Sequence, residues 1–590
     1  MRTVNLGILA HVDAGKTTLT ERLLHAAGVI DEPGSVDDGS TRTDSLALER
    51  ERGITIKAAV VSFAVGDVTV NLIDTPGHPD FIAEVERVLN VLDGAVLVVS
   101  AVEGVQAQTR VLMRALQRLR IPALFFVNKM DRRGASYDRT VAAIADKLTP
   151  AVVPVTDERR VAELAAPTRQ SLAHPAYAGS AITGAGVDAL IGGITELLPA
   201  ARHPADGPVA GTVFKVERGP SGEKIAFARM RSGTLRTRDR LAGGQKVTAI
   251  SVFDQGEAVR RPALAAGQIG KLWGLRDIRI GDAIGEAPPE VGRSFAPPTL
   301  ETVVVPLRPE DRGALHVALT QLAEQDPLID LRQDEELVVS LYGEVQKEVI
   351  QATLADEYGV DVAFERTATI CIERPAGTGA AFQIIDVEPN PFLATVGLRV
   401  DPAPLDSGVD FRLEVELGSM PGSFFKAVEE SAREALRHGV YGWEVKDCTL
   451  TMTHSGYWAK QSHSHAVFDK SMSSTAGDFR GLTPLVLRDA LRRAGTQVYE
   501  PLHRFRLEAP ADTLGAVFGA LARLLAVPGP PELRGEEAVI EGDIPAARVH
   551  ELEQQLPALT RGEGFLESEF ARYQAVRSPV PTRPVSADRR

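Results

Sequence analysis

Residues Val4 to Thr18 read V-N-L-G-I-L-A-H-V-D-A-G-K-T-T. The apolar start predicts a strand buried in a parallel sheet, and Thr18 to Leu24 predicts a helix. The turn between them fits the phosphate-binding pattern G-x-x-x-x-G-K-[ST], with Ala10 where the first glycine is usual. Such a turn aims backbone N–H groups and a helix N-terminus at anionic oxygens. We expect a phosphate site, with an incidental G-K-T in an ordinary strand-turn-helix as the alternative.

Two side chains of this turn have expected roles, and a third follows on a later loop. Lys16 is expected to reach the β- and γ-phosphates, and Thr17 to hold Mg²⁺. The segment Gly34 to Ile56 is polar, has little periodicity and ends in R-G-I-T-I, which indicates a mobile loop. Thr55 on this loop could close over Mg²⁺ and the γ-phosphate and release them after hydrolysis, or the segment could be an ordinary surface loop.

The strand-like stretch Val68 to Ile73 runs into D-T-P-G-H. Asp74 is placed to hold Mg²⁺ through its water shell, and Gly77 can donate its backbone N–H to the γ-phosphate. His78 lies where a residue that positions the attacking water is needed. A lone histidine after a turn is usually structural, but the spacing of the three preceding motifs favours the catalytic role.

A further apolar strand, Ala123 to Val127, ends in N-K-M-D. The Asp131 carboxylate can accept two hydrogen bonds from the N1–H and the exocyclic amine of guanine, an arrangement that adenine does not offer. The later G-S-A, which ends at Ala181, would add a backbone N–H for the guanine oxygen. Strands that alternate with helices predict a doubly wound parallel sheet with its ligand at the carboxyl ends of the strands.

Length and composition set the outer limits. A chain of 590 residues is expected to form about four domains. A net charge of −14 argues against a protein that coats nucleic acid with a uniformly basic surface. No apolar run reaches the length of a membrane span, and no signal peptide is apparent, so we expect a cytoplasmic protein and, by default, a monomer. Cys371 and Cys448 are interpreted as core residues.

Strand and helix patterns after the first domain indicate a barrel and two ferredoxin-like domains. Val209 to Ala287 shows short β segments between glycine turns, as in a small closed barrel. Glu301 to Phe364 has the order βαββαβ of a ferredoxin-like unit, and a similar order recurs from His503 to Phe570. Neither unit contains a set of catalytic residues, so both are expected to bind the surface of a partner.

The region from about Ala376 to Pro501 contains a cluster of cations and histidines, which is either an RNA-binding patch or a solvated face. Its members are Lys426, Arg433, Arg437, His438, Lys446, Lys460, His463, His465 and Lys470. The polar stretch Ser455 to Ala476 predicts a projecting loop that contacts RNA. A metal site at His454, His463 and His465 is disfavoured because no cysteine or carboxylate set with ligand spacing accompanies them.

Taken together, A-H-V-D-A-G-K-T, R-G-I-T-I, D-T-P-G-H, N-K-M-D and G-S-A resemble the motifs of translational GTPases. Asp131 and Ser180 are only 49 positions apart, so the chain resembles elongation factor G without the extra subdomain that this factor carries there. The resemblance implies that the residues Ala10, His11, Val12, Asp13, Ala14, Gly15, Lys16, Thr17, Thr18, Thr55, Asp74, Gly77, Asn128, Lys129, Asp131, Ser180 and Ala181 bind GTP. It also implies that His78 is catalytic and that Thr17, Thr55 and Asp74 hold Mg²⁺.

Four later segments resemble tetracycline ribosomal protection proteins of the Tet(M), Tet(O) and Otr(A) type more than elongation factor G. They are L-E-V-E-L-G-S-M-P, Y-G-W-E-V-K-D-C, T-A-G-D-F-R and L-R-R-A-G-T-Q-V-Y-E-P. In that family, loops of the fourth domain reach the decoding site and the drug leaves the ribosome. Two departures are F-D-K-S-M-S-S-T-A-G, where the family usually has a Tyr-Ser-Pro-type tip, and a Pro-rich tail where many relatives continue into a helix.

The resemblance predicts a multidomain chain that combines an α/β P-loop domain, a β-barrel, two ferredoxin-like α+β domains and one further α+β domain. The expected boundaries are 1–200 for the GTPase domain, 208–290 for the barrel, 299–374 and 501–576 for the ferredoxin-like domains, and 375–500 for domain IV, with a disordered tail at 577–590.

The expected partners are GTP, GDP and the ribosome, at the decoding site of the small subunit and the GTPase-associated region of the large subunit. The expected function is GTP-dependent release of tetracycline from the ribosome by non-covalent remodelling. The alternatives are a translocase like elongation factor G, or a ribosome-binding stress factor whose GTPase serves only as a timer.

Overall fold

The computed structural model describes residues 2–34, 41, 49, 55–155, 161–199, 205–241, 244–286, 298–333, 336–365, 367–459, 473–534, 537–576 and 579–583. The chain forms two compact units. One comprises Met1–Pro297, Val304–Leu331 and Val339–Ala363, and the other comprises Pro298–Val303, Arg332–Val338 and Phe364–Arg590. None of the described helices is both long enough and apolar enough to cross a membrane.

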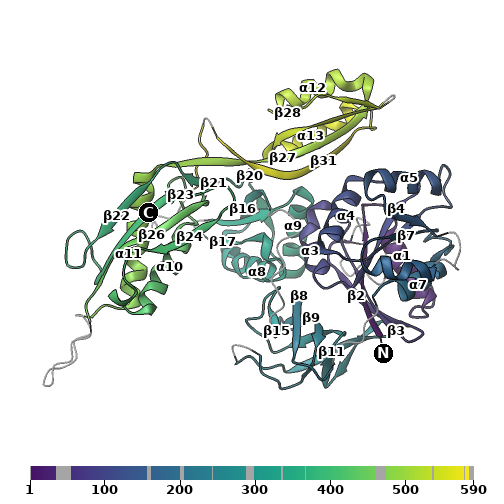
Figure 1. The fold of residues 1–590 in the computed structure, drawn as a ribbon, viewed down its shortest axis with the longest axis horizontal. Helices are drawn as coiled ribbons and strands as arrows, with labels where there is room; N and C mark the ends of the chain where they lie inside the picture. The colour runs from purple at the N-terminus through teal and green to yellow at the C-terminus, as the bar shows by residue number, and fades with distance from the viewer. Residues whose placement is uncertain are drawn as a thin grey trace. The chain divides into compact units, whose positions relative to one another are not determined.

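A seven-stranded sheet forms the N-terminal part of the first unit (Figure 1). Its order is β2-β3-β1-β4-β5-β7-β6, and only β2 runs antiparallel to its neighbour. The strands are β1 (Arg2–Ala10), β2 (Ala59–Val65), β3 (Val68–Asp74), β4 (Gly94–Ser100), β5 (Ala123–Asn128), β6 (Val152–Pro154) and β7 (His174–Ala178). The predicted doubly wound parallel sheet is therefore confirmed, with one antiparallel edge strand.

Helices cover both faces of this sheet, because its central strands β4 and β5 are apolar at nearly every position and are buried on both sides. In β4, Val96 and Val98 face a core built with Leu23 of α1, whereas Leu97 and Val99 face another core. The helices are α1 (Lys16–Ala26), α3 (Ile82–Leu89), α4 (Ala107–Leu119), α5 (Tyr137–Lys147), α6 (Val161–Arg169) and α7 (Val187–Leu197). The sequence pattern did not anticipate α5, α6 and α7. The predicted loop Gly34 to Ile56 lies outside the described residues except for 34, 41, 49, 55 and 56.

The barrel domain consists of a six-stranded antiparallel sheet, in the order β12-β11-β14-β9-β8-β15, and the pair β10-β13. The strands are β8 (Ala210–Arg218), β9 (Lys224–Ser232), β10 (Thr234–Arg236), β11 (Ala249–Asp254), β12 (Glu257–Arg261), β13 (Ala263–Ala265), β14 (Ile269–Trp273) and β15 (Ala283–Gly285). This domain contacts the segment after the predicted loop, since Lys215 donates to the Ala58 carbonyl oxygen at 2.5 Å.

The first ferredoxin-like domain has the predicted order βαββαβ. Its elements are β16 (Leu300–Pro306), α8 (Arg312–Gln325), β17 (Arg332–Gln333), β18 (Leu337–Leu341), α9 (Glu344–Tyr358) and β19 (Val362–Phe364). The strand order β17-β18-β16-β19 is that of the ferredoxin-like arrangement, and β20 (Ala368–Thr369) also pairs with β16.

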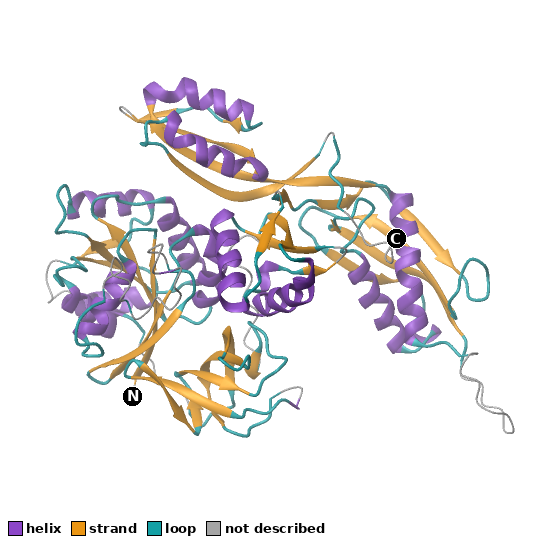
Figure 2. Cartoon of the chain, turned by 180° about the vertical axis from the view of Figure 1, so that it is seen from behind, coloured by secondary structure: helices purple, strands orange, loops and turns teal. Residues whose placement is uncertain are grey.

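Domain IV is a four-stranded sheet, β22-β23-β26-β24, with α10 and α11 packed together beside it (Figure 2). Its elements are β22 (Gly379–Gln383), β23 (Ala394–Pro402), β24 (Val409–Leu413), α10 (Gly422–Ala435), β26 (Cys448–Tyr457) and α11 (Ala476–Ala494). Cys371 and Cys448 are buried as predicted, and burial raises the pKa of both thiols to about 12.

The predicted projecting loop Ser455 to Ala476 begins later than expected. Ser455, Gly456 and Tyr457 continue β26, because they pair with Val396, Thr395 and Ala394 of β23. Residues 460–472, and with them Lys460, His463, His465, Lys470 and the first half of the tip sequence, lie outside the described residues.

The C-terminal domain repeats the ferredoxin-like arrangement on β27 (Thr496–Pro510), α12 (Leu514–Arg523), β28 (Val527–Pro528), β29 (Glu532–Arg534), β30 (Glu537–Pro545), α13 (Ala546–Leu559) and β31 (Phe565–Ala575). Strand β27 pairs with β30 on one side and β31 on the other. Its first residues pair with β21 (Ile372–Pro375), which in turn pairs with β25 (Glu444–Val445).

The expectation of a disordered tail is wrong for residues 579–583. The Trp443 indole donates to the Pro581 carbonyl oxygen at 2.8 Å, and the Arg583 backbone N–H donates to the Tyr441 carbonyl oxygen at 2.9 Å. The Arg583 guanidinium stacks on the Trp443 ring and pairs with Glu301. These polar contacts hold a stretch whose composition alone suggested disorder.

Acid should destabilise the second unit through His503. Burial lowers the pKa of this histidine to about 4, below its ordinary 6.5, and among the described residues its Nδ1 atom has no hydrogen-bond partner. Below pH 6.5 the unfolded chain binds a proton at His503 that the folded chain does not bind. The free energy of unfolding therefore falls between pH 6.5 and pH 4, by at most about 3 kcal/mol. We expect His503→Gln to reduce the fall in the midpoint of thermal unfolding between pH 7.5 and pH 5.

His550→Gln, on the exposed side of α13, is the matched control and should leave that fall unchanged. An equal fall in unaltered protein and in His503→Gln would contradict the prediction.

Candidate functional site

The phosphate loop joins β1 to α1. Gly15 precedes α1 with φ = 87°, in the left-handed region, where a side chain would strain the backbone. A Cβ atom there would also lie 2.4 Å from the Asn128 side-chain nitrogen. The loop closes on itself through a hydrogen bond from the Ala14 N–H to the His11 carbonyl oxygen. The left-handed backbone and the close Asn128 side chain together explain why glycine precedes the lysine at this turn.

Lys16 brings three oxygen-bearing side chains together. Its Nζ atom lies 2.5 Å from Asp74 Oδ1, 3.0 Å from Thr55 Oγ1 and 3.5 Å from Thr17 Oγ1. The two threonine hydroxyl oxygens lie 3.2 Å apart. Lys16 is 6% exposed and Asp74 is fully buried, so the two charges neutralise each other away from water.

Gly77 and His78 lie beside the phosphate loop. A Cβ atom on Gly77 would be 3.2 Å from the Ala10 carbonyl oxygen, so only glycine approaches the loop this closely without a shift. The Asp80 N–H donates to Nδ1 of His78 at 3.2 Å, which leaves the proton of a neutral imidazole on Nε2. Asp80 is itself held by the Gln346 N–H at the start of α9.

At the other end of the pocket, Asn128 joins two loops. Its side-chain amide donates to the Ala14 carbonyl oxygen at 2.8 Å and accepts from the Ala181 N–H at 2.9 Å. A hydrogen bond from the Ser180 hydroxyl keeps the pKa of Asp131 below its ordinary value. Lys129 has φ = 63° and pairs with Glu103 at 2.9 Å. The Asp131 carboxylate is therefore ionised and oriented at neutral pH.

These residues line one pocket of about 660 Å³. Of the predicted residues, those lining it are His11, Val12, Asp13, Gly15, Lys16, Thr17, Thr18, Thr55, Gly77, His78, Asn128, Lys129, Asp131, Ser180 and Ala181. The other three lie directly behind the lining: Ala10 below Gly77, Ala14 bonded to Asn128, and Asp74 bonded to Lys16.

Five lining residues were not predicted, namely Arg22, Pro33, Gly34, Arg132 and Ile182. Arg132 and Ile182 directly follow predicted residues, so extending each motif by one position would have found them. Arg22 had no such signal, because its position depends on how α1 packs beside the loop after β7.

His11 connects the phosphate loop to α4. Burial lowers the pKa of its imidazole to about 4, so the ring is neutral at pH 7. Its Nδ1 atom lies 3.1 Å from the Thr109 hydroxyl oxygen in the first turn of α4. A neutral, buried contact of this kind positions the loop rather than supplying charge to a ligand.

Comparisons with known proteins agree on one family. Residues 1–200 match the elongation factor Tu GTP binding domain, and residues 295–366, 368–495 and 497–584 match elongation factor G domain III, domain IV and C-terminus. The chain is 47% identical to the oxytetracycline resistance protein of Streptomyces rimosus, over 99% of this chain and 97% of that protein. The chain belongs to the tetracycline ribosomal protection proteins.

More distant relatives extend the comparison. The tetracycline resistance protein TetM of Streptomyces lividans is 44% identical over 100% of this chain and 98% of its own length, and TetM from transposon Tn916 of Enterococcus faecalis is 35% identical over 99% and 98%. A crystal structure of a Thermus thermophilus protein has the same fold, with a TM-score of 0.64 and 24% identity over 98% of each chain. This protection protein is a GTPase with the multidomain architecture of elongation factor G.

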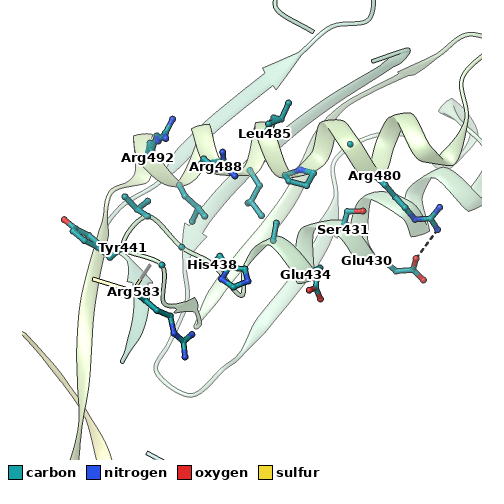
Figure 3. A pocket seen from close by; sticks show the side chains of 18 of the residues that line it. Glu430, Ser431, Glu434, His438, Tyr441, Arg480, Leu485, Arg488, Arg492 and Arg583 are labelled. Atoms are coloured by element: carbon teal, nitrogen blue, oxygen red, sulfur yellow. Dashed lines mark hydrogen bonds and ion pairs between the residues drawn. The ribbon is translucent and has the colours of Figure 1, made fainter. Parts of the chain in front are cut away.

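A second pocket of the protection protein, of about 800 Å³, lies in the other unit beside α10 and α11 (Figure 3). Arg480 on its wall pairs with Glu430 at 3.4 Å. The described cations of the predicted basic cluster also have acidic neighbours: Lys426 pairs with Glu430, Arg433 with Glu429, Arg437 with Glu434, and Lys446 with Glu444. This balance favours a solvated, ion-paired face over a basic patch on the described part of the cluster.

His454, one of the disfavoured metal ligands, stacks on the Phe382 ring with centroids 4.7 Å apart and contacts the Thr453 hydroxyl at 2.9 Å. Among the described residues, no group of three or more histidines, cysteines or carboxylates could hold a metal ion.

Asn128→Ala should loosen the whole pocket. It leaves the buried Ala14 carbonyl oxygen and Ala181 N–H without their partner, at a cost of about 1–3 kcal/mol for each group. We expect a lower midpoint of thermal unfolding without nucleotide, and at least tenfold weaker GTP binding by titration calorimetry.

Asn90→Ala is the matched control. It removes a single hydrogen bond to the Glu86 carbonyl oxygen, outside the pocket, and should leave GTP affinity unchanged. Equal affinity of Asn128→Ala and unaltered protein would show that this junction does not shape the site.

Proposed function

We propose that this protein is a ribosome-dependent GTPase that docks on the ribosome in the GTP-bound state, dislodges tetracycline without covalent chemistry, and leaves after hydrolysis. Support comes from its 47% identity to an oxytetracycline resistance protein along nearly the whole chain. The observation that carries the proposal is the pocket itself, which collects residues from six separate segments, including Thr55 of the loop expected to be mobile and Gly77 of D-T-P-G-H.

The side chains around Lys16 suit Mg²⁺ with GTP. Thr17, Thr55 and Asp74 present oxygen atoms, the ligands that this hard cation prefers, and in this structure they surround an ammonium. We propose that these three residues hold Mg²⁺, which when bound supplies positive charge to the β- and γ-phosphate oxygens. Lys16 is then free to turn from Asp74 toward those phosphates.

Recognition of guanine falls to the opposite end of the pocket. Asp131 is ionised and held by Ser180, so its carboxylate can accept from the N1–H and the exocyclic amine of guanine. Asn128 and Lys129 flank the base, and Ala10 to Thr18 surround the phosphates. Loss of the γ-phosphate removes the ligand that orders Thr55 and Gly77, which gives the site its two states.

His78 is proposed as the residue that positions the attacking water. Its Nδ1 atom accepts from the Asp80 N–H, so its Nε2–H can donate a hydrogen bond toward the pocket that the residue lines. Asp80 in turn accepts from α9, so a change at α9 can alter the aim of the imidazole. We propose this linkage as the route by which ribosome binding raises the hydrolysis rate.

The remaining domains are proposed to do the work on the ribosome. The loop between β26 and α11, of which residues 460–472 lie outside the described residues, is proposed to reach the decoding site of the small subunit. The GTPase domain would meet the GTPase-associated region of the large subunit. We propose that the protein acts as a monomer in the cytoplasm, where ribosomes are found.

His78→Ala should separate binding from hydrolysis. The substitution leaves Lys16, Asp131 and the loop backbone in place, so GTP affinity should stay within about twofold of that of unaltered protein. Loss of the group that positions water should lower ribosome-stimulated turnover by about 100-fold or more. Phosphate release in the presence of ribosomes measures the rate, and His25→Ala on α1 is the control. Undiminished turnover in His78→Ala would remove the catalytic role.

Drug release decides between the proposal and its alternatives. Ribosomes carrying labelled tetracycline are incubated with the protein and GTP, GDP or a non-hydrolysable GTP analogue, and retained label is measured after filtration. We expect release with GTP and with the analogue, because binding rather than hydrolysis displaces the drug, and multiple turnover only with GTP.

Failure to release the drug, together with polypeptide synthesis in an extract depleted of elongation factor G, would instead favour a translocase. If both assays fail while ribosomes still stimulate GTP hydrolysis, the result would favour a ribosome-binding stress factor that acts without the drug.

A further inference from the structure

In the loop that follows β7, the backbone N–H of Ile182 is available to a ligand at the nucleotide pocket. The N–H groups on either side of it are used within the protein: Ser180 donates to the Ala185 carbonyl oxygen, Ala181 to Asn128 Oδ1, Thr183 to Ser180 Oγ, and Gly184 to the Ser180 carbonyl oxygen. Among the described residues, the Ile182 N–H has no acceptor, and Ile182 lines the nucleotide pocket. This N–H is therefore the group of the loop that can meet a carbonyl oxygen of the base.

Arg22 holds the same loop from the side of α1. Its Nε atom donates to the Ala181 carbonyl oxygen at 3.0 Å, and its Nη2 atom donates to the Ile182 carbonyl oxygen. The aliphatic part of the side chain passes Gly184, where a Cβ atom would lie 3.6 Å from Arg22 Cδ. A planar guanidinium with several fixed donors can hold two adjacent carbonyl groups, whereas a lysine ammonium lacks this geometry.

The orientation of the Ile182 N–H follows from these bonds. In a trans peptide the C=O and N–H groups point in opposite directions. Since Arg22 holds the Ala181 carbonyl oxygen, the N–H of the same peptide, which belongs to Ile182, is turned away from the guanidinium. On the other side of Ala181, the bond to Asn128 fixes the preceding peptide. Both peptides around Ala181 are thus fixed before any ligand arrives.

We infer that Arg22 is a positioning residue for base specificity, and that it aims the Ile182 N–H at the 6-carbonyl oxygen of guanine. This role rests on the proposed guanine site at Asp131. Arg22 and Lys16 lie on the same helix, six residues or about 9 Å apart along its axis. Helix α1 therefore sets the loop that contacts the base at a fixed distance from the residue that contacts the phosphates.

The test compares three nucleotides that differ at the base edge. GTP presents the N1–H, the exocyclic amine and the 6-carbonyl oxygen. ITP lacks the exocyclic amine that Asp131 would contact, and 6-thio-GTP replaces the 6-carbonyl oxygen by a poorer acceptor. Dissociation constants are measured for the full chain and for Arg22→Met. We expect unaltered protein to prefer GTP over 6-thio-GTP, and Arg22→Met to reduce that preference about tenfold. The preference for GTP over ITP should stay the same.

Two further variants complete the test. Arg22→Lys, which keeps the charge but loses the fork, should fall between Arg22→Met and unaltered protein. Arg169→Met is the matched control, because Arg169 also donates to a backbone carbonyl oxygen of the same domain, that of Glu196, but away from the pocket. It should leave both preferences unchanged.

Weaker binding of all three nucleotides by the same factor in Arg22→Met would overturn the inference, since it would mean a merely structural role. Unchanged affinities in Arg22→Met would overturn it as well. Equal affinity of unaltered protein for ATP and GTP would be a different result, because it would overturn the guanine site itself and with it the role of Arg22.

Discussion

The buried ammonium of Lys16 is the constraint on which the nucleotide pocket depends. The Lys16 side chain is only 6% exposed, so its charge needs a partner of opposite sign. The fully buried carboxylate of Asp74, at the end of β3, is that partner. Thr55 joins the same cluster from the loop before β2, so three distant segments are held by one charge. We propose that a bound nucleotide competes for this charge and thereby moves those segments.

The opposite end of the pocket is built differently, from neutral hydrogen bonds that a ligand does not need to break. Asn128 ties the phosphate loop to the loop after β7, and Arg22 ties that loop to α1. In the function that we propose, the end that binds the base is thus prearranged, whereas the end that binds the phosphates exchanges partners. Within the same unit, bonds from Lys215 to Ala58 and from Gln346 to Asp80 connect the exchangeable end to the barrel domain and to α9.

Most of the fold was predictable because its strands are strongly patterned. Strands β3 and β5 end within one residue of the predicted stretches Val68 to Ile73 and Ala123 to Val127, and the two ferredoxin-like orders appear as βαββαβ predicts. Of the three missed helices of the first domain, α5 and α6 have weak burial patterns, with only two buried residues in each. The late start of the domain IV loop and the docking of residues 579–583 depend on partners far away in sequence, β23 and Trp443, which local composition does not reveal.

The sequence by itself determined the family, since five short motifs match those of translational GTPases through residue types at fixed spacings, and from these motifs we propose the groups that meet phosphate, Mg²⁺ and guanine. Only the tertiary structure decided which side chains hold those motifs in place. Arg22 has no signature of its own, because its importance comes from carbonyl groups 159 and 160 positions away along the chain. The opening stretch Val4 to Thr18 therefore indicates the class of ligand, whereas contacts between distant segments of the fold determine the geometry of the binding site.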